Sequence, residues 1–403
     1  MAKNDAGVTK LDNGNWEYRF VMVVDGKKVT SRKRKDELGN LLTTKRAAIK
    51  ARQAAMKKAQ LGMKHTAPTA KKTVAEVYKE YCEKGRSGKA YATIRKQDSL
   101  WNNHLCARFG KRYIDEINVA EIVDYLTELY YTDGLAFKYV ESFLKMFYLI
   151  FGQAYSRNYL DVDTYSKLCL NKGTKIHMPK MKTSEEDDVA IFTQEELARM
   201  DEYFSGSNGE TAYLLGKYCG LRINECYGIR WENVNLEEGT ILIDRQMQYQ
   251  DGLIKLVSLK TRNAKRTVMM NDKLKVYFQK LVQERTTAEH EMAAVRQQNQ
   301  TFITDLDGKM LSSLELVNSL PDGKIQTVNS MKYHSRTIKQ KLEIAFKFHY
   351  LRHTYGTHMA ELNTPPHLLC NQMGHGNIRV TQKYYIAVSQ TGLDILQNNL
   401  NRI

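Results

Sequence analysis

Two polar stretches, each with a proline, interrupt the apolar periodicity of this chain at residues 64–70 and 171–188. The second stretch also changes from basic to acidic along its length. Because a chain of 403 residues is too long to pack around one core, these breaks predict separate domains. We expect the domains at residues 1–63, 71–170 and 189–403, with residues 171–188 as the interdomain linker.

Residues 1–63 predict a small β-sheet packed on one helix. Apolar residues recur at every second position from Trp16 to Met22, which is typical of a half-buried strand. Asp25-Gly26 then supplies a hairpin turn. Residues 43–60 are rich in Ala and Lys, as a helix would be.

The charge of the chain favours a polyanionic partner. It has 61 Lys and Arg against 45 Asp and Glu, a net charge of +16, and residues 1–63 hold 15 against 6 of these, or +9. No apolar run of about 18 residues and no signal-peptide-like stretch occurs. We therefore expect a cytoplasmic protein that binds DNA and no membrane. The candidate DNA contacts in the first domain form one basic run: Arg32, Lys33, Arg34 and Lys35.

The other two domains differ in their patterns. Residues 71–170 predict an all-helical domain, and residues 189–403 a mostly helical one with a small antiparallel sheet. A helix N-cap pattern stands near the start of each, at Thr73 and at Thr193. The strand-like segments are separated by two turns, Glu238-Gly239 and Asp251-Gly252. The fold class is therefore multi-domain α+β.

Four short segments of residues 189–403 carry the candidate chemistry. They are GLRINE, SLKTRNAKRTVMM, HYLRHTYGTH and QMGHGNIRVTQKYY, and they supply Arg222, Lys260, His349, Arg352, His375, Tyr384 and Tyr385. Each signal alone has an ordinary explanation, such as a surface arginine, a packed histidine or a packed tyrosine pair. Their occurrence together, in this order, indicates one site.

These side chains fit the transfer of a DNA phosphoryl group to tyrosine. Two guanidinium groups can clamp the equatorial oxygens of the transition state through permanently charged, bidentate hydrogen bonds. A tyrosine hydroxyl, with a pKa of about 10, needs a base or electrostatic help to attack. A lysine on a hairpin can protonate the leaving 5′-oxygen, and two histidines complete the donor set.

No metal or other cofactor is expected. The arginines supply the charge that Mg²⁺ supplies in other phosphoryl-transfer sites. The six cysteines are scattered without a CxxC pair, and His349 and His353 lack a second pair of ligands nearby. A structural zinc site is therefore not expected either.

The four segments resemble the catalytic signature of the tyrosine recombinase, or phage integrase, family. GLRINE is similar to the first arginine box of that family, LRHT to the second, and MGHGNI to its LGH box. Residues 73–170 resemble the family's core-binding domain. Residues 1–63 resemble the arm-binding domain of integrases from conjugative transposons and temperate phages.

The resemblance implies a role for each candidate residue. Arg222 and Arg352 would bind the scissile phosphate, and Lys260 would be the general acid. His349 and His375 would donate hydrogen bonds to the phosphate or help to move the tyrosine proton. Glu225 would orient a neighbouring side chain.

The nucleophile is Tyr384 or Tyr385, which follow His375 by nine and ten residues. The family usually shows a histidine shortly after its tyrosine, and YYIAV lacks it. The residues that follow slightly favour Tyr385, whereas TQK before the pair favours Tyr384. Both remain open, with a slight preference for Tyr385.

The resemblance also implies an integrase that cuts and rejoins double-stranded DNA through a 3′-phosphotyrosine to integrate and excise a mobile element. It implies a homotetramer on two DNA sites, contacts with core and arm sites, and a possible excision factor or DNA-bending protein. It also implies a bacterial protein associated with the nucleoid. The alternatives are a non-enzymatic DNA-binding regulator and a type IB topoisomerase. The regulator has no need of the four segments, and the topoisomerase has no need of an arm domain.

Overall fold

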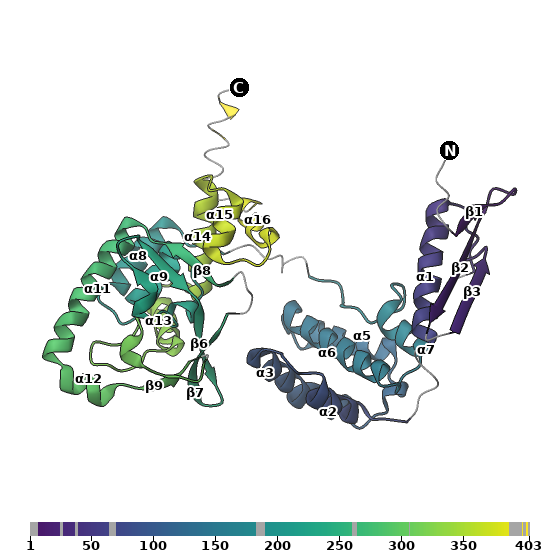
Figure 1. Ribbon diagram of the computed structural model, residues 1–403, viewed down its shortest axis with the longest axis horizontal. Coiled ribbons are helices and arrows are strands. Elements are labelled where there is room, and N and C mark those ends of the chain that lie inside the picture. Colours follow the sequence, from purple (N-terminus) through teal and green to yellow (C-terminus); the bar gives the residue numbers. More distant parts are fainter. Residues whose placement is uncertain are drawn as a thin grey trace. The chain divides into compact units, whose positions relative to one another are not determined.

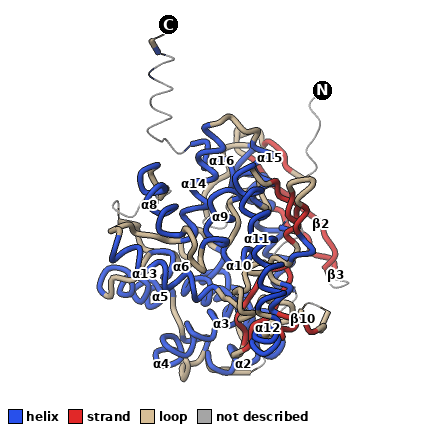
Figure 2. The backbone as a smooth tube through the Cα atoms, turned by 90° about the vertical axis from the view of Figure 1, so that its left-hand side faces the viewer, coloured by secondary structure: helices blue, strands red, loops and turns tan. Residues whose placement is uncertain are grey.

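The computed structural model is largely helical, with a smaller share of strands (Figure 1, Figure 2). It divides into two compact units, Met1–Glu185 and Glu186–Ile403. The residues described are 7–24, 27–36, 39–63, 70–182, 190–259, 264–305, 307–386, 397 and 400–401. The expected turn Asp25-Gly26 and the candidate residue Lys260 lie outside these ranges.

The first unit begins with the expected sheet packed on one helix. The elements are β1 (Val8–Lys10), β2 (Trp16–Val24), β3 (Lys27–Lys33) and α1 (Lys45–Met63), and the strands pair antiparallel in chain order. Tyr18 and Phe20 of β2 are buried with Ala48 and Ala51 of α1. Since side chains alternate across a strand, the residues between them, such as Arg19, point away from α1.

A helical region with its own core follows, as predicted. Its α-helices are α2 (Val74–Lys84), α3 (Tyr91–Leu100), α4 (Cys106–Phe109), α5 (Val119–Thr127), α6 (Phe137–Ser156) and α7 (Val162–Tyr165). Thr73 is the N-cap of α2, as predicted, and Glu76 completes a capping box. The rings of Phe109, Phe143 and Phe147 are buried in the core.

Part of the expected linker, residues 171–188, packs against the helical core. Ile176 is fully buried in the helical core, and the Tyr148 hydroxyl donates to its carbonyl at 2.6 Å. Residues 171–182 therefore include part of that core's packing, whereas residues 183–189 lie outside the described ranges. Composition indicates a polar segment here, but it cannot reveal a partner that lies on a distant helix.

The second unit combines helices with short strands. Its α-helices are α8 (Gln194–Phe204), α9 (Glu210–Cys219), α10 (Ile223–Cys226), α11 (Asp272–Glu291), α12 (Ala293–Asn299), α13 (Val328–Lys341), α14 (Phe348–Glu361), α15 (Pro366–Met373) and α16 (Ile378–Ile386). Its strands are β4 (Val234–Asn235), β5 (Thr240–Ile243), β6 (Arg245–Gln250), β7 (Leu253–Ser258), β8 (Arg266–Met269), β9 (Phe302–Thr304) and β10 (Met310–Ser312). Thr193 caps α8 as predicted.

The sequence predicts one antiparallel sheet in this unit, whereas the described strands form two. The first has the order β4-β5-β8 and the second β10-β9-β7-β6, with β7 and β9 parallel at Lys255 and Thr304. The predicted turn Asp251-Gly252 joins β6 to β7 with positive φ at both residues, as a type I′ hairpin requires. The sequence does not predict strands β9 and β10, because β9 pairs with β7, which lies far earlier in the chain.

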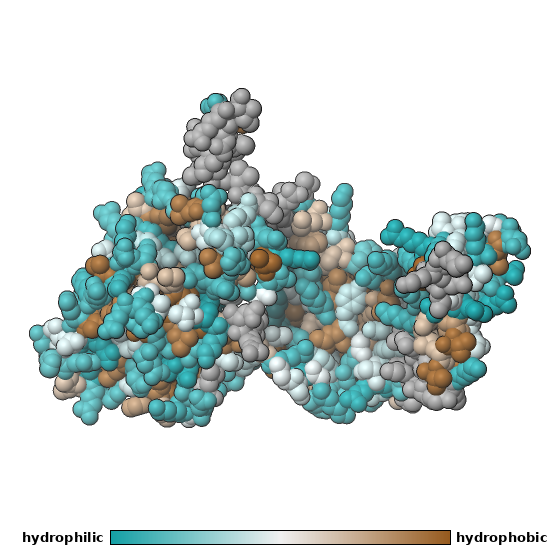
Figure 3. All heavy atoms as spheres, turned by 45° about the horizontal axis from the view of Figure 1, so that its top comes forward, coloured by the Kyte–Doolittle hydropathy of each residue, from teal (hydrophilic) through white to brown (hydrophobic). Residues whose placement is uncertain are grey.

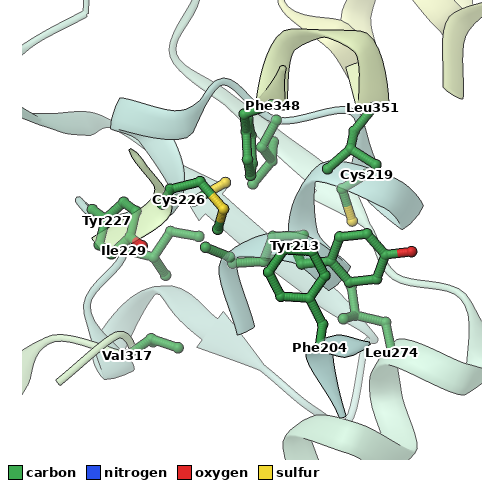
Figure 4. Packing of buried hydrophobic residues seen from close by; sticks show 14 of the residues in the cluster. Phe204, Tyr213, Cys219, Cys226, Tyr227, Ile229, Leu274, Val317, Phe348 and Leu351 are labelled. Carbon is green, nitrogen blue, oxygen red and sulfur yellow. The ribbon is translucent and has the colours of Figure 1, made fainter. Parts of the chain in front are cut away.

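The core of the second unit brings α14 close to α9. Figure 4 shows Phe348 and Leu351 of α14 packed beside Cys219 and Tyr213 of α9, and all four side chains are buried. A Cβ at Gly216 of α9 would lie 2.7 Å from the Phe348 ring, so a larger residue there would push the helices apart. This contact sets the HYLRHT segment beside the end of α9.

The surface of the described residues is mainly hydrophilic. On the face seen in Figure 3, apolar residues form scattered spots on both units, which is ordinary for a globular protein. None of the described helices is both long and apolar enough to cross a membrane.

Candidate active site

The first arginine is held by the turn between α9 and α10. Gly220 ends α9 in the left-handed conformation (φ 60°, ψ 29°), which glycine adopts without strain. Arg222 follows in an extended conformation, and the Glu225 carboxylate accepts its backbone N–H at 3.0 Å. The Arg222 guanidinium donates to Glu225 at 2.7 Å and to the carbonyl of Gly374 at 3.4 Å. GLRINE thus fixes both the backbone and the side chain of Arg222.

Arg352 of α14 reaches the same two chain segments. Its guanidinium donates to the carbonyls of Gly220 and Met373, both at 2.6 Å, and the residue is 1 % exposed. Burial and the nearby charge of Arg222 lower the pKa of Arg352 to about 9, which leaves it charged at neutral pH. The two predicted arginines therefore meet where the turn after α9 approaches the end of α15.

The sequence does not identify a third arginine at this place, Arg266 at the start of β8. It donates to Glu225 at 3.0 Å and to the carbonyl of Gln372 at 2.9 Å. Burial acts to raise the pKa of Glu225, but Arg266 and Arg222 outweigh it, so the shift is downward and the carboxylate is charged. The guanidinium groups of Arg222 and Arg266 thus both bind the Glu225 carboxylate, and the charge of that carboxylate also acts on Arg352. These four side chains carry three positive charges and one negative, a surplus of two.

Three histidines lie next to the arginines. His349 and His353 stand one turn apart on α14 with ring centroids 4.6 Å apart, and His375 follows the C-cap of α15. His375 is 7 % exposed, with Nδ1 2.7 Å from the Thr381 hydroxyl. Burial lowers the pKa of His375 to about 3 and that of His353 to about 4. At neutral pH these two imidazoles are uncharged, so each can donate one hydrogen bond and accept another.

The structure distinguishes the two tyrosines. Tyr384 is 2 % exposed, and its hydroxyl lies 3.2 Å from Nδ1 of His353. Burial raises the pKa of Tyr384, and the positive charge of Arg352 partly offsets this. Tyr385 is 37 % exposed and donates to the carbonyl of Thr364.

The slight preference for Tyr385 drawn from the sequence therefore disagrees with this geometry. Adjacent residues of a helix point about 100° apart, so only one of the pair can face α14. That residue is Tyr384.

The remaining candidate residues are Lys260 and the basic run of the first domain. Lys260 is outside the described ranges. Arg32 and Arg34 both donate to Glu17, at 2.6 and 3.1 Å, on the outward face of the first sheet. Lys33 is opposite a core-facing residue of β2, and Lys35 lies beyond the end of β3. Because side chains alternate along a strand, Arg32 and Arg34 lie on the outward face of the sheet, whereas Lys33 lies on the opposite face.

His353 is the other residue of the site that the sequence does not assign to the chemistry. It stands out in the sequence only as half of a metal-like His spacing. Within the described ranges, no group of three or more His, Cys, Asp or Glu side chains is arranged to hold a metal ion. The same spacing places His353 on the helix face that carries His349, and this signal in the sequence could have identified it.

Known proteins resemble this chain in sequence and fold. A model of the phage integrase family matches residues 192–391, and a model of the N-terminal SAM-like domain of phage integrases matches residues 73–130. A tyrosine recombinase XerC-like protein of Caldanaerobacter subterraneus subsp. tengcongensis is 24 % identical over 317 residues, which cover 75 % of this chain and 76 % of that protein.

Two solved structures extend the likeness. A fragment of the Tn1549 transposon integrase in complex with a circular intermediate DNA has a TM-score of 0.63 at 18 % identity, covering 81 % of this chain and 99 % of that one. A lambda integrase tetramer bound to a Holliday junction has a TM-score of 0.51 at 13 % identity, and the match covers 95 % of this chain and 96 % of that one. At these identities the likeness concerns the fold.

Proposed function

The chain belongs to the phage integrase family and is a site-specific DNA recombinase of the tyrosine type, and we propose that it integrates and excises a mobile element through a 3′-phosphotyrosine intermediate. Strand cleavage by this route conserves the phosphodiester energy in the protein–DNA bond. Rejoining then needs no ATP.

The surplus of positive charge at the site carries this proposal. Arg352 is buried, and no carboxylate among the described residues forms an ion pair with it. A buried charge that no carboxylate contacts directly is costly unless an anion arrives to balance it. A guanidinium has five N–H donors, so the two bonds to backbone carbonyls leave Arg352 with donors for a phosphate oxygen. A DNA phosphodiester is the anion that fits.

The roles of the site residues follow from this chemistry. Arg222 and Arg352 would grip the scissile phosphate and the charge that grows on its oxygens in the transition state. Tyr384 would attack phosphorus, since its hydroxyl lies in the group of side chains that includes Arg352. His349 and His375 would each donate a hydrogen bond, and Lys260 would protonate the leaving 5′-oxygen.

The partners we propose are double-stranded core and arm sites, bound by a homotetramer on two DNA molecules. The fold likeness to a lambda integrase tetramer on a Holliday junction supports this assembly. Residues 1–63 would bind the arm sites, residues 71–170 the core site, and residues 189–403 would perform the cleavage. An excision factor or a DNA-bending protein would complete the reaction in one direction.

Covalent trapping on a pool of nicked duplexes with randomised sequence tests the proposal. We expect the full chain to become covalently attached to a subset of the pool, because the short strand beyond the nick diffuses away after cleavage. The trapped duplexes are recovered by denaturing electrophoresis and sequenced, which defines a crossover substrate. Two copies of that sequence on one plasmid should then recombine.

The same assays separate the alternative functions. A non-enzymatic regulator would trap no DNA and leave the plasmid unchanged. A type IB topoisomerase would relax a supercoiled plasmid without exchanging the paired sites. Either result would contradict the proposed function.

The two faces of the N-terminal sheet give a further prediction. Arg32→Ala is expected to weaken DNA binding by the full chain and to reduce the slope of log K against log salt by about 0.9, the loss of one phosphate contact. Lys33→Ala is the matched control, because it removes the same charge from the neighbouring position. Binding is measured by fluorescence anisotropy at several salt concentrations. Equal losses for the two variants would contradict a DNA contact through the outward face.

A further inference from the structure

The hydroxyl of Tyr384 has a partner that the chemistry described so far does not use. Nδ1 of His353 lies 3.2 Å from it, and the two ring centroids are 5.8 Å apart. His353 is the residue directly after Arg352 on α14. The same helix therefore supplies a phosphate-binding arginine and the group that contacts the proposed nucleophile.

The Tyr384 ring is held firmly enough for this contact to matter. A Cβ at Gly356, one turn further along α14, would lie 3.0 Å from three atoms of the ring, so the backbone of α14 packs directly against it. The ring of His375 is also stacked on it at 6.0 Å with an interplanar angle of 18°. With the ring fixed, the remaining freedom is the direction of the O–H bond.

We propose that His353 is a positioning residue, whose Nδ1 accepts the hydrogen bond of the Tyr384 hydroxyl and so turns an oxygen lone pair, rather than the O–H, toward the phosphate. The inference rests on the proposed function of Tyr384 as the nucleophile.

The physical reason is that the Tyr384 O–H bond could otherwise point at the phosphate. A phenol O–H directed at a phosphate oxygen would form a hydrogen bond and leave no lone pair aimed at phosphorus. A hydrogen-bond acceptor on the side of the hydroxyl away from the phosphate holds the O–H bond there and so prevents this competing hydrogen bond. His353 can serve as one because burial, aided by the charges of His349, Lys383 and Arg352, lowers its pKa to about 4 and keeps the imidazole neutral.

Three substitutions at this position test the idea. An Asn carbonyl oxygen occupies about the place of a histidine Nδ1, whereas a Gln carbonyl reaches the place of Nε2. We expect His353→Ala and His353→Gln to slow single-turnover cleavage about tenfold, the loss of one orienting hydrogen bond. His353→Asn should stay within about threefold of the wild-type rate. All variants should bind the duplex with unchanged affinity.

The substrate is the nicked crossover duplex recovered by trapping, and the full chain is used throughout. His358→Ala is the matched control, since His358 is an exposed histidine of the same helix, and it should cleave at the wild-type rate. Thermal unfolding of each variant identifies any that fails to fold, and His353→Asn then carries the test.

The outcomes are distinct from those that test the proposed function. If wild type traps no DNA, or Tyr384→Phe still traps it, the proposed function of Tyr384 fails. If those two results are as expected, an Ala variant that cleaves as fast as wild type, or faster, overturns the positioning role. Equal rates for the folded Ala and Asn variants would also overturn it, because the acceptor atom would then be irrelevant.

Discussion

Replacing Arg222 with lysine is expected to reduce DNA cleavage by about 10²–10³ while DNA binding survives. Lysine keeps the positive charge but loses the planar fork that can grip two phosphate oxygens at once. Its ammonium group can still reach Glu225, the partner that Arg222 holds at 2.7 Å, so the local fold should persist. The measurement is the single-turnover rate of covalent complex formation on the nicked crossover duplex, with affinity measured in parallel.

Arg352→Lys should give a similar loss, and it needs a stability control. The Arg352 guanidinium donates hydrogen bonds to the carbonyls of Gly220 and Met373, so the variant also loses structural hydrogen bonds. Thermal unfolding shows whether it is folded at the assay temperature. Arg199→Lys, at an exposed position of α8, is the matched control. An Arg222→Lys protein that cleaves within tenfold of wild type would contradict a bidentate role in the transition state.

Local signals explain how much of the fold can be read from the sequence. Thr73 and Thr193 cap helices through residues only three positions away, Glu76 and Glu196, so these helix starts can be predicted without tertiary information. The turn Asp251-Gly252 is equally local. The parallel pairing of β7 with β9, and the packing of Ile176 into the helical core, depend on partners far along the chain and leave no local pattern.

The candidate site shows the same division. Its two predicted arginines and two predicted histidines can be identified because their boxes have recognisable neighbours. Arg266 escapes prediction because its importance comes from Glu225, which is distant in sequence and buried against it. Surplus charge at a site is a property of the assembled fold, and composition gives only the total for the chain.

The choice between the tyrosines depends on how α16 is rotated against α14. Three contacts fix that rotation: the close approach of Gly356 to the Tyr384 ring, the bond between Thr381 and His375, and the stacking of Tyr384 on His375. All three join α16 to another segment. A local sequence comparison of YYIAV contains none of them, so it could not decide between the pair.

Tyr384→Phe is therefore expected to form no covalent complex with the nicked crossover duplex, whereas Tyr385→Phe should retain most of the wild-type rate. Phenylalanine preserves the ring that packs against Gly356 but has no oxygen to attack phosphorus, so folding and DNA binding should be unaffected. Tyr385 is the matched control, because its hydroxyl bonds the carbonyl of Thr364 instead of a side chain of the site. Complexes are counted after denaturing electrophoresis.

The reverse result would move the nucleophile to Tyr385, and it would require α16 to rotate by about 100° when DNA binds. If both variants still trapped DNA, neither tyrosine would be the sole nucleophile, and the proposed phosphotyrosine route through this site would be excluded.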